Sequence, residues 1–365
     1  MAAFADAYRG RRVFVTGHTG FKGAWLAMWL ASSGNHVCGF ALDPVPGALF
    51  EAARVTELLE LDVRADVRDA AAVVRAVERA APEVIVHMAA QPLVRESYLS
   101  PRLTVETNVL GTLNVLEAAR SVGGVRGHVV VTTDKVYRND GRTQGYVEGD
   151  PLGGHDPYSA SKAMADLLAQ SWALSLDGPP TAVARAGNVI GGGDVSPDRL
   201  VPDLVRSFEA GRVPELRHPE ALRPWQHVLD CLNGYLMLAD VLVAGGSPAS
   251  PGEPWNFGPD LPLVTVADLS ALVAALWGGA PAPRQAGPSE FRESSVLSLD
   301  STKARRELGW ESLLSFDVAV EWTVEWYRAV HDGADARDQT LRQLERYREL
   351  ASARPALTRR STPAP

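Results

Sequence analysis

Lysine is scarce in this chain, which suggests that the few lysines are present where the chemistry of an amine is needed. The 365 residues include 36 lysines and arginines, of which only Lys22, Lys135, Lys162 and Lys303 are lysine. Lys135 directly follows Asp134 in "VVVTTDKVY", where a short apolar run ends in polar residues. An ammonium can lose its proton in a suitable environment, whereas a guanidinium stays charged. Asp134 and Lys135 are therefore candidate reactive residues, with a solvated polar turn as the alternative.

A second pair whose spacing could support chemistry is Tyr158 and Lys162 in "HDPYSASK". Asp156 suits the N-cap of a helix and Pro157 its first position. Tyr158 and Lys162 then lie one turn apart on the same helix face. An ammonium beside a tyrosine lowers the pKa of the phenol and so favours a phenolate base. It could also bind a ribose. For an isolated pair, an ordinary surface tyrosine and lysine would be the better interpretation.

A glycine-rich loop, "VFVTGHTGFKG", places Gly17, Gly20 and Gly23 at intervals of three between a predicted strand and a predicted helix. Glycine permits the tight turn and the close approach of the backbone to a pyrophosphate at the helix N-terminus. Asp43 ends the next predicted strand, near the spacing of an acid that binds a ribose hydroxyl. Because an acid there would repel a 2′-phosphate, the loop predicts NAD rather than NADP. The alternative is a structural turn and a surface aspartate.

The elements that must position these residues alternate between strand and helix. We predict an α/β fold, a Rossmann-type doubly wound parallel sheet that binds ligands at the carboxyl ends of its strands. The predicted strands cover residues 12–17, 36–42, 59–63, 83–90, 128–133 and 181–190, and the predicted helices 21–34, 68–81, 101–122 and 157–176.

After residue 187 glycine and proline become frequent and strands scarce, which indicates a smaller, mainly helical C-terminal lobe for the substrate. We expect residues 1–186 to form the NAD-binding domain, with 226–258 returning to it. Residues 187–225 and 259–350 would form the smaller lobe. Residues 351–365 are rich in proline, serine and arginine and are predicted to be a disordered tail.

The composition excludes several classes of protein. A net charge of −8 argues against nucleic acid or an anionic membrane as a partner. No apolar run reaches the length that spans a bilayer, and the first residues lack a signal-peptide core. Cys38 and Cys231 form neither a disulfide framework nor a metal-binding spacing, so no metal is predicted. These features predict a cytoplasmic protein.

Longer stretches of the chain resemble known enzymes. The glycine loop and the Tyr–Lys pair are typical of the extended short-chain dehydrogenase/reductase superfamily. The stretches "TTDKVY", "GGHDPYSASK", "RAGNVIGGGD" and "RPWQHVLD" resemble the CDP-glucose 4,6-dehydratases, and the resemblance covers about residues 12–326. It implies conversion of CDP-D-glucose into its 4-keto-6-deoxy product. The steps would be oxidation at C4 by NAD, loss of water across C5 and C6, and return of the hydride to C6.

The resemblance also implies roles for the residues. Tyr158 would take the O4 proton beside Lys162, and Thr133 would polarise the C4 oxygen. Asp134 would protonate the departing C6 hydroxyl, and Lys135 would remove the C5 hydrogen. For these roles we expect Lys135 to be buried without a tight anion, which would depress its pKa, and Asp134 to be desolvated, which would raise its own.

Further contacts are implied around both ligands. For the substrate, Arg223 is the first choice because a guanidinium grips phosphate oxygens in a fork, and Asn188 is a plausible second contact. Arg199 and Arg206 are secondary candidates that could equally be surface charges, and His227 could equally be a packed histidine. The residues expected at NAD are Gly17, Thr19, Gly20, Phe21, Lys22, Gly23, Asp43, Asp66, Val67, Ala89, Ala90, Gln91, Asn108, Tyr158 and Lys162.

Two departures from the family pattern lie near the expected nucleotide-sugar pocket: "DGRTQGY" lacks a tryptophan, and Val195 stands where the family tends to have one. The rival interpretations are a dehydratase of another nucleotide-hexose, a nucleotide-sugar 4-epimerase, and a non-catalytic NAD-binding regulator. Related enzymes dimerise by packing two helices into a four-helix bundle. We therefore expect a homodimer through the helices at 101–122 and 157–176.

Overall fold

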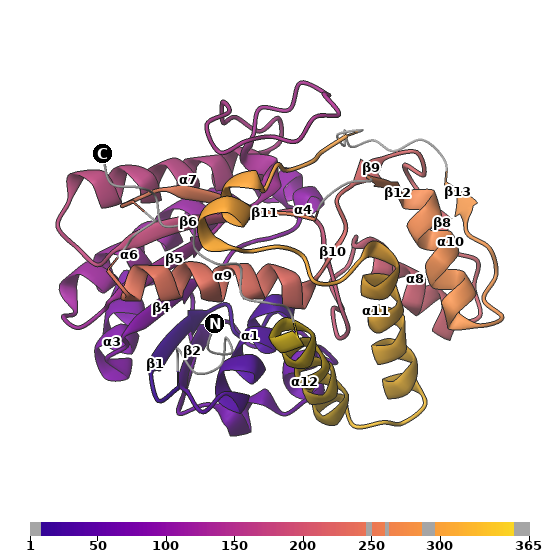
Figure 1. Ribbon diagram of the computed structural model, residues 1–365, viewed down its shortest axis with the longest axis horizontal. Helices are drawn as coiled ribbons and strands as arrows, with labels where there is room; N and C mark the ends of the chain where they lie inside the picture. The colour runs from indigo at the N-terminus through magenta and orange to yellow at the C-terminus, as the bar shows by residue number, and fades with distance from the viewer. Residues whose placement is uncertain (1–8, 246–249, 260–262, 287–295, 354–365) are drawn as a thin grey trace.

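The computed structural model describes residues 9–245, 250–259, 263–286 and 296–353. Its centre is a sheet in which all neighbouring strands run parallel, in the order β3-β2-β1-β4-β5-β6-β11. The doubly wound Rossmann-type sheet is therefore confirmed (Figure 1). Its strands are β1 (Arg12–Thr16), β2 (His36–Ala41), β3 (Leu61–Arg64), β4 (Val84–His87), β5 (Gly127–Val131), β6 (Thr181–Ala186) and β11 (Pro254–Phe257).

Helices cover both faces of this sheet because alternate strand residues point to opposite sides. Val13 and Val15 belong to the core that includes α1 (Phe21–Ser32) and α9 (Val228–Val243). Phe14, between them, packs on the other face with residues of α3 (Ala70–Ala80) and α6 (Gly111–Ser121). Val130 of β5 packs on that same face with residues of α6 and α7 (Pro157–Ser175).

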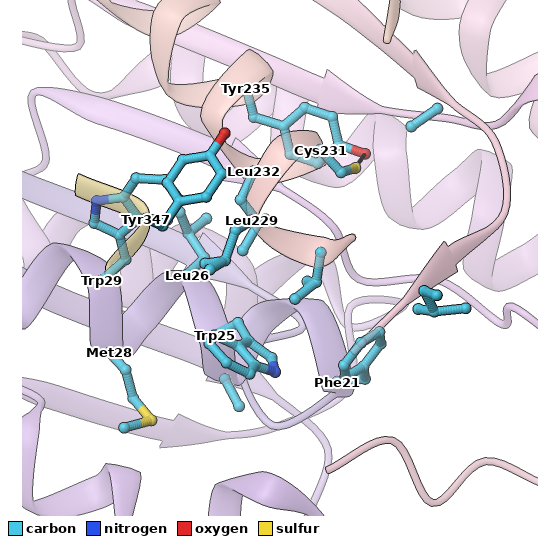
Figure 2. Packing of buried hydrophobic residues seen from close by; sticks show 14 of the residues in the cluster. Phe21, Trp25, Leu26, Met28, Trp29, Leu229, Cys231, Leu232, Tyr235 and Tyr347 are labelled. Atoms are coloured by element: carbon cyan, nitrogen blue, oxygen red, sulfur yellow. Dashed lines mark hydrogen bonds between the residues drawn. The ribbon is translucent and has the colours of Figure 1, made fainter. Parts of the chain in front are cut away.

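Helices α1 and α9 are buried almost all round, as expected of helices that are apolar on every side. A third helix, α12 (Ala336–Ala353), packs against α1 (Figure 2). The Tyr347 ring meets the Trp29 ring edge-on at 5.5 Å between centroids. The Tyr347 hydroxyl donates to Asp230 of α9 at 2.8 Å. The last helix thus packs on the NAD-binding side, although residues 259–350 were assigned to the substrate lobe. The periodicity of apolar residues predicts where a helix begins and ends. It does not predict which element the helix packs against.

The smaller lobe lies beyond the carboxyl ends of the strands (Figure 1). Its helices are α8 (Leu200–Glu209), α10 (Val266–Trp277) and α11 (Phe316–His331). It also holds short strand pairs whose pairing the sequence did not predict, although residues 189–190 lay within the strand predicted at 181–190. They are β7 (Val189–Ile190) with β10 (Gln226–His227), β8 (Glu215–Leu216) with β13 (Arg284–Gln285), and β9 (Leu222–Arg223) with β12 (Val264–Thr265).

The remaining elements are short. The helix predicted at 101–122 is one rod composed of α5 (Pro101–Val105), a π-helical turn η2 (Glu106–Leu110) and α6. The others are α2 (Leu49–Ala52), η1 (Val55–Leu58), α4 (Val94–Leu99), η3 (Asp134–Val136) and η4 (Ala304–Leu308). Within the described ranges, no helix is long and apolar enough to cross a bilayer, and no group of metal-ligating side chains gathers. Most of the predicted disordered tail, residues 354–365, lies outside the described residues.

Candidate active site

The candidate site lies where β5 ends and α7 begins. Thr133 follows β5 and caps the short η3 turn, its hydroxyl accepting from the Lys135 amide at 3.4 Å. Asp156 caps α7 as predicted, its carboxylate accepting from the Ser159 amide at 2.8 Å. The N-terminal turn of α7 carries Tyr158, and α7 contacts η3. The strand end and the helix start thereby bring the Thr-Asp-Lys segment and the tyrosine together.

Asp134 is completely buried, with unequal environments at its two carboxyl oxygens. Oδ1 accepts from the Thr133 hydroxyl at 2.9 Å and lies 3.5 Å from the Lys135 Nζ. Oδ2 has no partner among the described residues and lies beside Gly187, where an added Cβ would be 3.2 Å away. A buried polar atom without a partner is costly. Oδ2 is therefore a natural contact for a polar group of a bound ligand.

Lys135 differs from its predicted environment. We expected a buried amine without a tight anion, but the side chain is 31% exposed and Asp134 lies within ion-pair distance. That expectation was wrong because successive residues of a tight turn point in different directions. Asp134 therefore points inward while Lys135 keeps contact with solvent. The amine still stays at the site, held at 3.5 Å from the buried carboxylate.

Tyr158 also differs from expectation in its electrostatics. Burial raises the pKa of the phenol to about 12; the hydrogen bond with Thr133 opposes this rise, and the nearby Asp134 charge adds to it. The Lys162 ammonium donates instead to the Val131 carbonyl at 2.8 Å. Burial, together with the nearby charge of Lys22, lowers the pKa of Lys162 to about 7. The expected lowering of the tyrosine pKa by Lys162 is thus absent from this structure.

A third lysine, Lys22, lies at the same site. Its ammonium donates to the Tyr235 hydroxyl at 3.1 Å and lies 5.3 Å from the centre of that ring. The Cys231 thiol donates to the same hydroxyl at 3.1 Å (Figure 2). Tyr235 and Cys231 were not predicted here. They lie on α9, more than two hundred residues after the glycine loop, in a run that reads only as a core helix.

The glycine loop fits a dinucleotide. Gly17 has φ +75°, and a Cβ there would lie 2.8 Å from the Ala89 amide nitrogen. A Cβ on Gly23 would lie 2.1 Å from the Gly17 carbonyl oxygen, so neither position admits a side chain. Gly20 caps α1 without a side-chain hydrogen bond, and the first turn of α1 holds no acid. The first amides of α1 therefore suit a pyrophosphate. Thr19 anchors the loop by donating to the Leu42 carbonyl at 3.0 Å.

Asp43 follows β2 with 89% of its side chain exposed, as a ribose-binding acid requires. Arg64 lies 3.9 Å from it, but the guanidinium is already paired with Asp62 through bonds of 2.6 and 2.8 Å. Because Arg64 is paired with Asp62, it does not neutralise the charge of Asp43. The Asp43 carboxylate would therefore repel a 2′-phosphate. Asp62 also bonds the buried His18 ring at 2.9 Å. This contact had no sequence signal, since 44 residues separate the two.

The other residues predicted at NAD take varied positions. Asn108, in the π-helical turn, exchanges hydrogen bonds of 2.8 and 3.1 Å with the Gln91 backbone and donates to Ser161 of α7 at 2.8 Å. It therefore fastens the loop after β4 to the Tyr–Lys helix. Asp66 is paired with Arg68. Phe21 and Val67 are buried, Lys22 and Ala90 are half-buried, and Ala89 lies against Gly17.

Three predicted substrate contacts are buried polar groups or lie near Tyr158. The Asn188 Oδ1 is buried and has no partner among the described residues. Arg199 pairs with Asp194 at 2.9 Å, and its charge lowers the pKa of Tyr158, which places it near the site. Arg223 is buried on β9 and donates to the Leu222 carbonyl at 2.9 Å.

The other two make structural contacts: His227 is the packed histidine given as its alternative, whereas Arg206, for which a surface charge was the alternative, bonds a neighbouring loop. Arg206 donates to the carbonyls of Val195 and Ser196 at 3.0 and 3.3 Å, which secures the loop before α8. His227 is fully buried, caps α9 through the Leu229 amide and lies edge-on to Trp25 and Trp322. Burial lowers the His227 pKa to about 3.

Comparison with known proteins gives this geometry a family. The chain is 41% identical over 350 residues to a CDP-glucose 4,6-dehydratase of Salmonella typhimurium, covering 93% of this chain and 97% of that one. It is 29% identical over 339 residues to a dTDP-glucose 4,6-dehydratase of Xanthomonas campestris, covering 86% of this chain and 92% of that one.

A solved structure is also similar. DesIV, a dTDP-glucose 4,6-dehydratase of Streptomyces venezuelae crystallised with NAD and TYD bound, superimposes with a TM-score of 0.76 at 29% identity. The match covers 88% of this chain and 98% of that one. The family model described as NAD dependent epimerase/dehydratase matches residues 13–258. Since that match spans more than half of the sequence, the chain belongs to the NAD dependent epimerase/dehydratase family.

Proposed function

We propose that this protein is an NAD-dependent 4,6-dehydratase that converts CDP-D-glucose into CDP-4-keto-6-deoxy-D-glucose. The observation that carries the proposal is the Asp134–Lys135 pair beside Tyr158, with one buried carboxyl oxygen left for a ligand. An epimerase has no elimination step and would not need this pair. A non-catalytic regulator would not need to keep both Tyr158 and Lys162. The similarity to the Salmonella CDP-glucose 4,6-dehydratase supports the choice of nucleotide.

The first step uses Tyr158 and Thr133. The glycine loop at Gly17, Gly20 and Gly23 would hold NAD, which would supply the hydride acceptor for C4 and the hydride donor for C6. Tyr158 takes the proton of the O4 hydroxyl, and the Thr133 hydroxyl binds the same oxygen as it becomes a carbonyl. Lys162, whose pKa of about 7 leaves both protonation states accessible near neutral pH, lies one turn along α7.

The second step uses the pair. Once C4 is a ketone, the hydrogen on C5 is acidic. Lys135 as a free amine takes that proton, the C5–C6 double bond forms, and the C6 hydroxyl leaves as water with a proton from Asp134. Transfer of one proton across the 3.5 Å pair, from ammonium to carboxylate, produces the free amine and the carboxylic acid together. The two groups therefore reach their working states as a unit.

The test is turnover of several nucleotide-hexoses in deuterated water, followed by mass spectrometry. We expect CDP-glucose to lose one water and to gain deuterium at C5, with dTDP-glucose and UDP-glucose converted more slowly. Faster conversion of another nucleotide-hexose would support the proposed reaction but contradict CDP-glucose as the substrate. A product of unchanged mass with inverted C4 stereochemistry would identify an epimerase. Absence of turnover with every sugar would support the regulator.

We also propose that the protein is a homodimer formed through the helices α5–η2–α6 and α7. These helices carry large apolar side chains that solvent reaches in the single chain, among them Leu110, Met164, Leu167 and Leu174. Buried in a four-helix bundle, such side chains would contribute through the hydrophobic effect. Leu167→Glu should convert a dimer into a monomer by multi-angle light scattering. Leu350→Glu, on the exposed side of α12, is the control. A wild-type monomer at micromolar concentration would contradict the proposal.

Finally, we propose that the enzyme works in the cytoplasm. Its two cysteines, Cys38 and Cys231, are both free and buried, and so gain nothing from an oxidising compartment. Cell fractionation with an antibody against the untagged protein checks this.

A further inference from the structure

A buried ion pair lies directly behind the candidate site. Asp166 is one turn beyond Lys162 on α7, and its carboxylate accepts two bonds from Arg185 of β6, at 2.7 and 2.8 Å. Both side chains are almost fully excluded from solvent. Thr132 donates to the same carboxylate at 2.8 Å, and Gln170 at 2.6 Å. Each carboxylate oxygen thus has two donors, so the pair has a single well-defined geometry.

The same pair holds both ends of the reacting segment. Thr132 immediately precedes Thr133, and its hydroxyl is bound by Asp166. Tyr137 follows η3, and its hydroxyl accepts from the Arg185 Nη1 at 2.8 Å. That hydroxyl in turn donates to Asn256 of β11 at 2.7 Å. Residues 133–136, between these two points, therefore have their position relative to α7 set by one charge pair.

Stability alone does not account for such a pair. Desolvating two charges costs several kcal/mol each, and apolar replacements of similar volume are often neutral or stabilising. Hydrophobic residues neighbour the pair on the same elements: Val183 lies two residues before Arg185 on β6, and Ala169 lies three residues after Asp166 on α7, in one buried cluster with Val130. An apolar core in place of the Asp166–Arg185 pair is therefore compatible with the fold. The presence of the two charges needs an explanation other than stability.

We propose that Asp166 and Arg185 are positioning residues that hold the Thr133–Lys135 segment in register with Tyr158 and Lys162. The proposal rests on the proposed function, because it assigns the pair to the same reaction. It also states that turnover depends on Asp166 and Arg185. The Thr133–Lys135 segment separates these two residues from the substrate.

Asp166 also acts on Lys162 through its charge. The charged groups that influence the Lys162 ammonium are Lys22 of α1, which lowers its pKa, and Asp166, which raises it. His87 of β4 also senses the Lys162 charge, but burial keeps that ring neutral. Removing the Asp166 charge should therefore lower the pKa of Lys162 further.

The experiment compares Asp166→Asn and Thr132→Val with wild type. Because a misplacement of about 1 Å can cost about 10²-fold in rate, we expect kcat of Asp166→Asn to fall by about that factor while KM changes little. Thr132→Val keeps the shape, removes one bond and should show a smaller fall. Unchanged kcat in both variants, with CDP-glucose converted by wild type, would overturn the proposal. Should Asp166→Asn not fold, Thr132→Val and Tyr137→Phe decide the question on the same terms.

A second readout does not require turnover. Four lysines make a spectrum of 13C-labelled lysine simple to assign, so the titration of Lys162 can be followed directly. We expect its midpoint to fall in Asp166→Asn and to stay unchanged in the control Lys303→Arg. An unmoved midpoint would remove the electrostatic part of the proposal. If wild type converts no nucleotide-sugar, the proposed function fails, and the titration still tests the link between Asp166 and Lys162.

Discussion

Two aspartate–cation pairs are linked through Thr132, which donates to Asp166 and lies two residues before Asp134, and they behave in opposite ways. Asp166–Arg185 is short, bidentate and almost free of solvent, and each carboxylate oxygen has two donors. Asp134–Lys135 is longer, at 3.5 Å, has a cation that is 31% exposed, and leaves one carboxyl oxygen without a partner among the described residues.

The difference follows the chemistry of the two cations. A guanidinium keeps its proton and matches a carboxylate with a planar fork, so a buried Asp–Arg pair is permanent. An ammonium is a point charge that can give up its proton, so an Asp–Lys pair with a free oxygen can exchange protons with a ligand. Asp166–Arg185 is therefore the fixed pair and Asp134–Lys135 the reactive pair.

The largest expected effect lies in the reactive pair. Lys135→Ala should reduce formation of the 4-keto-6-deoxy product by about 10²- to 10⁴-fold, the typical contribution of a general acid or base. Lys135→Arg should be equally inactive, because it restores the charge but not a removable proton. Both variants should still bind NAD. The measurement is product release by mass spectrometry, with NAD binding by fluorescence as the control. An active Lys135→Arg enzyme would show that Lys135 supplies only charge.

The fixed pair should instead be sensitive to the loss of one partner. Arg185→Met leaves a buried carboxylate without its cation and should lower the free energy of unfolding by about 3–5 kcal/mol. The double variant Asp166→Leu/Arg185→Met should recover most of this stability but not the turnover. Urea unfolding and initial rates measured on the same preparations check both statements. A double variant as active as wild type would make the pair a purely structural feature.

The sequence predicted more about the reactive pair than about the fixed one. Strand–helix alternation, the glycine loop and the Tyr-x-x-x-Lys spacing are local patterns, and each predicted element lies within a few residues of its observed range. The Thr-Asp-Lys segment could be placed because the carboxyl ends of parallel strands meet at one edge. Asp166 and Arg185 carry no such signal, since they occur within an ordinary helix and strand.

What the sequence missed depends on contacts between distant residues. Tyr235 reaches Lys22 across 213 positions, and Asp62 reaches His18 across 44. The exposure of Lys135 and the raised pKa of Tyr158 depend on how tightly η3 and α7 enclose each group, which is a property of packing. The placement of α12 on α1 likewise depends on a partner 319 positions away, since Arg348 donates to the Trp29 carbonyl.

Lys162 allows a pH test of how much the burial of an amine lowers the free energy of unfolding. Its pKa falls from 10.5 to about 7 in the folded chain, so between those values the unfolded chain binds more protons. Stability of the NAD-free protein should therefore rise with pH across that window. Lys162→Met should abolish this rise and be the more stable variant below pH 7. Urea midpoints at several pH values, with Lys303→Met as the control, measure it. Parallel curves for wild type and Lys162→Met would contradict the assignment.

The smallest expected effect concerns a third buried acid, Asp230, which binds neutral donors in place of a cation. Ser312, the Leu313 and Leu314 amides and Tyr347 all donate to it, and burial still raises its pKa. Tyr347→Phe removes one donor of four and should cost about 1 kcal/mol near neutral pH, the net value of a typical hydrogen bond. Because that hydroxyl stabilises the carboxylate, the loss should shrink as the pH falls through the raised pKa and the acid becomes neutral. Urea unfolding of wild type and Tyr347→Phe at neutral and acidic pH would show this narrowing. A constant difference would mean that the tyrosine acts through the packing of its ring on Trp29 and not through its bond to the acid.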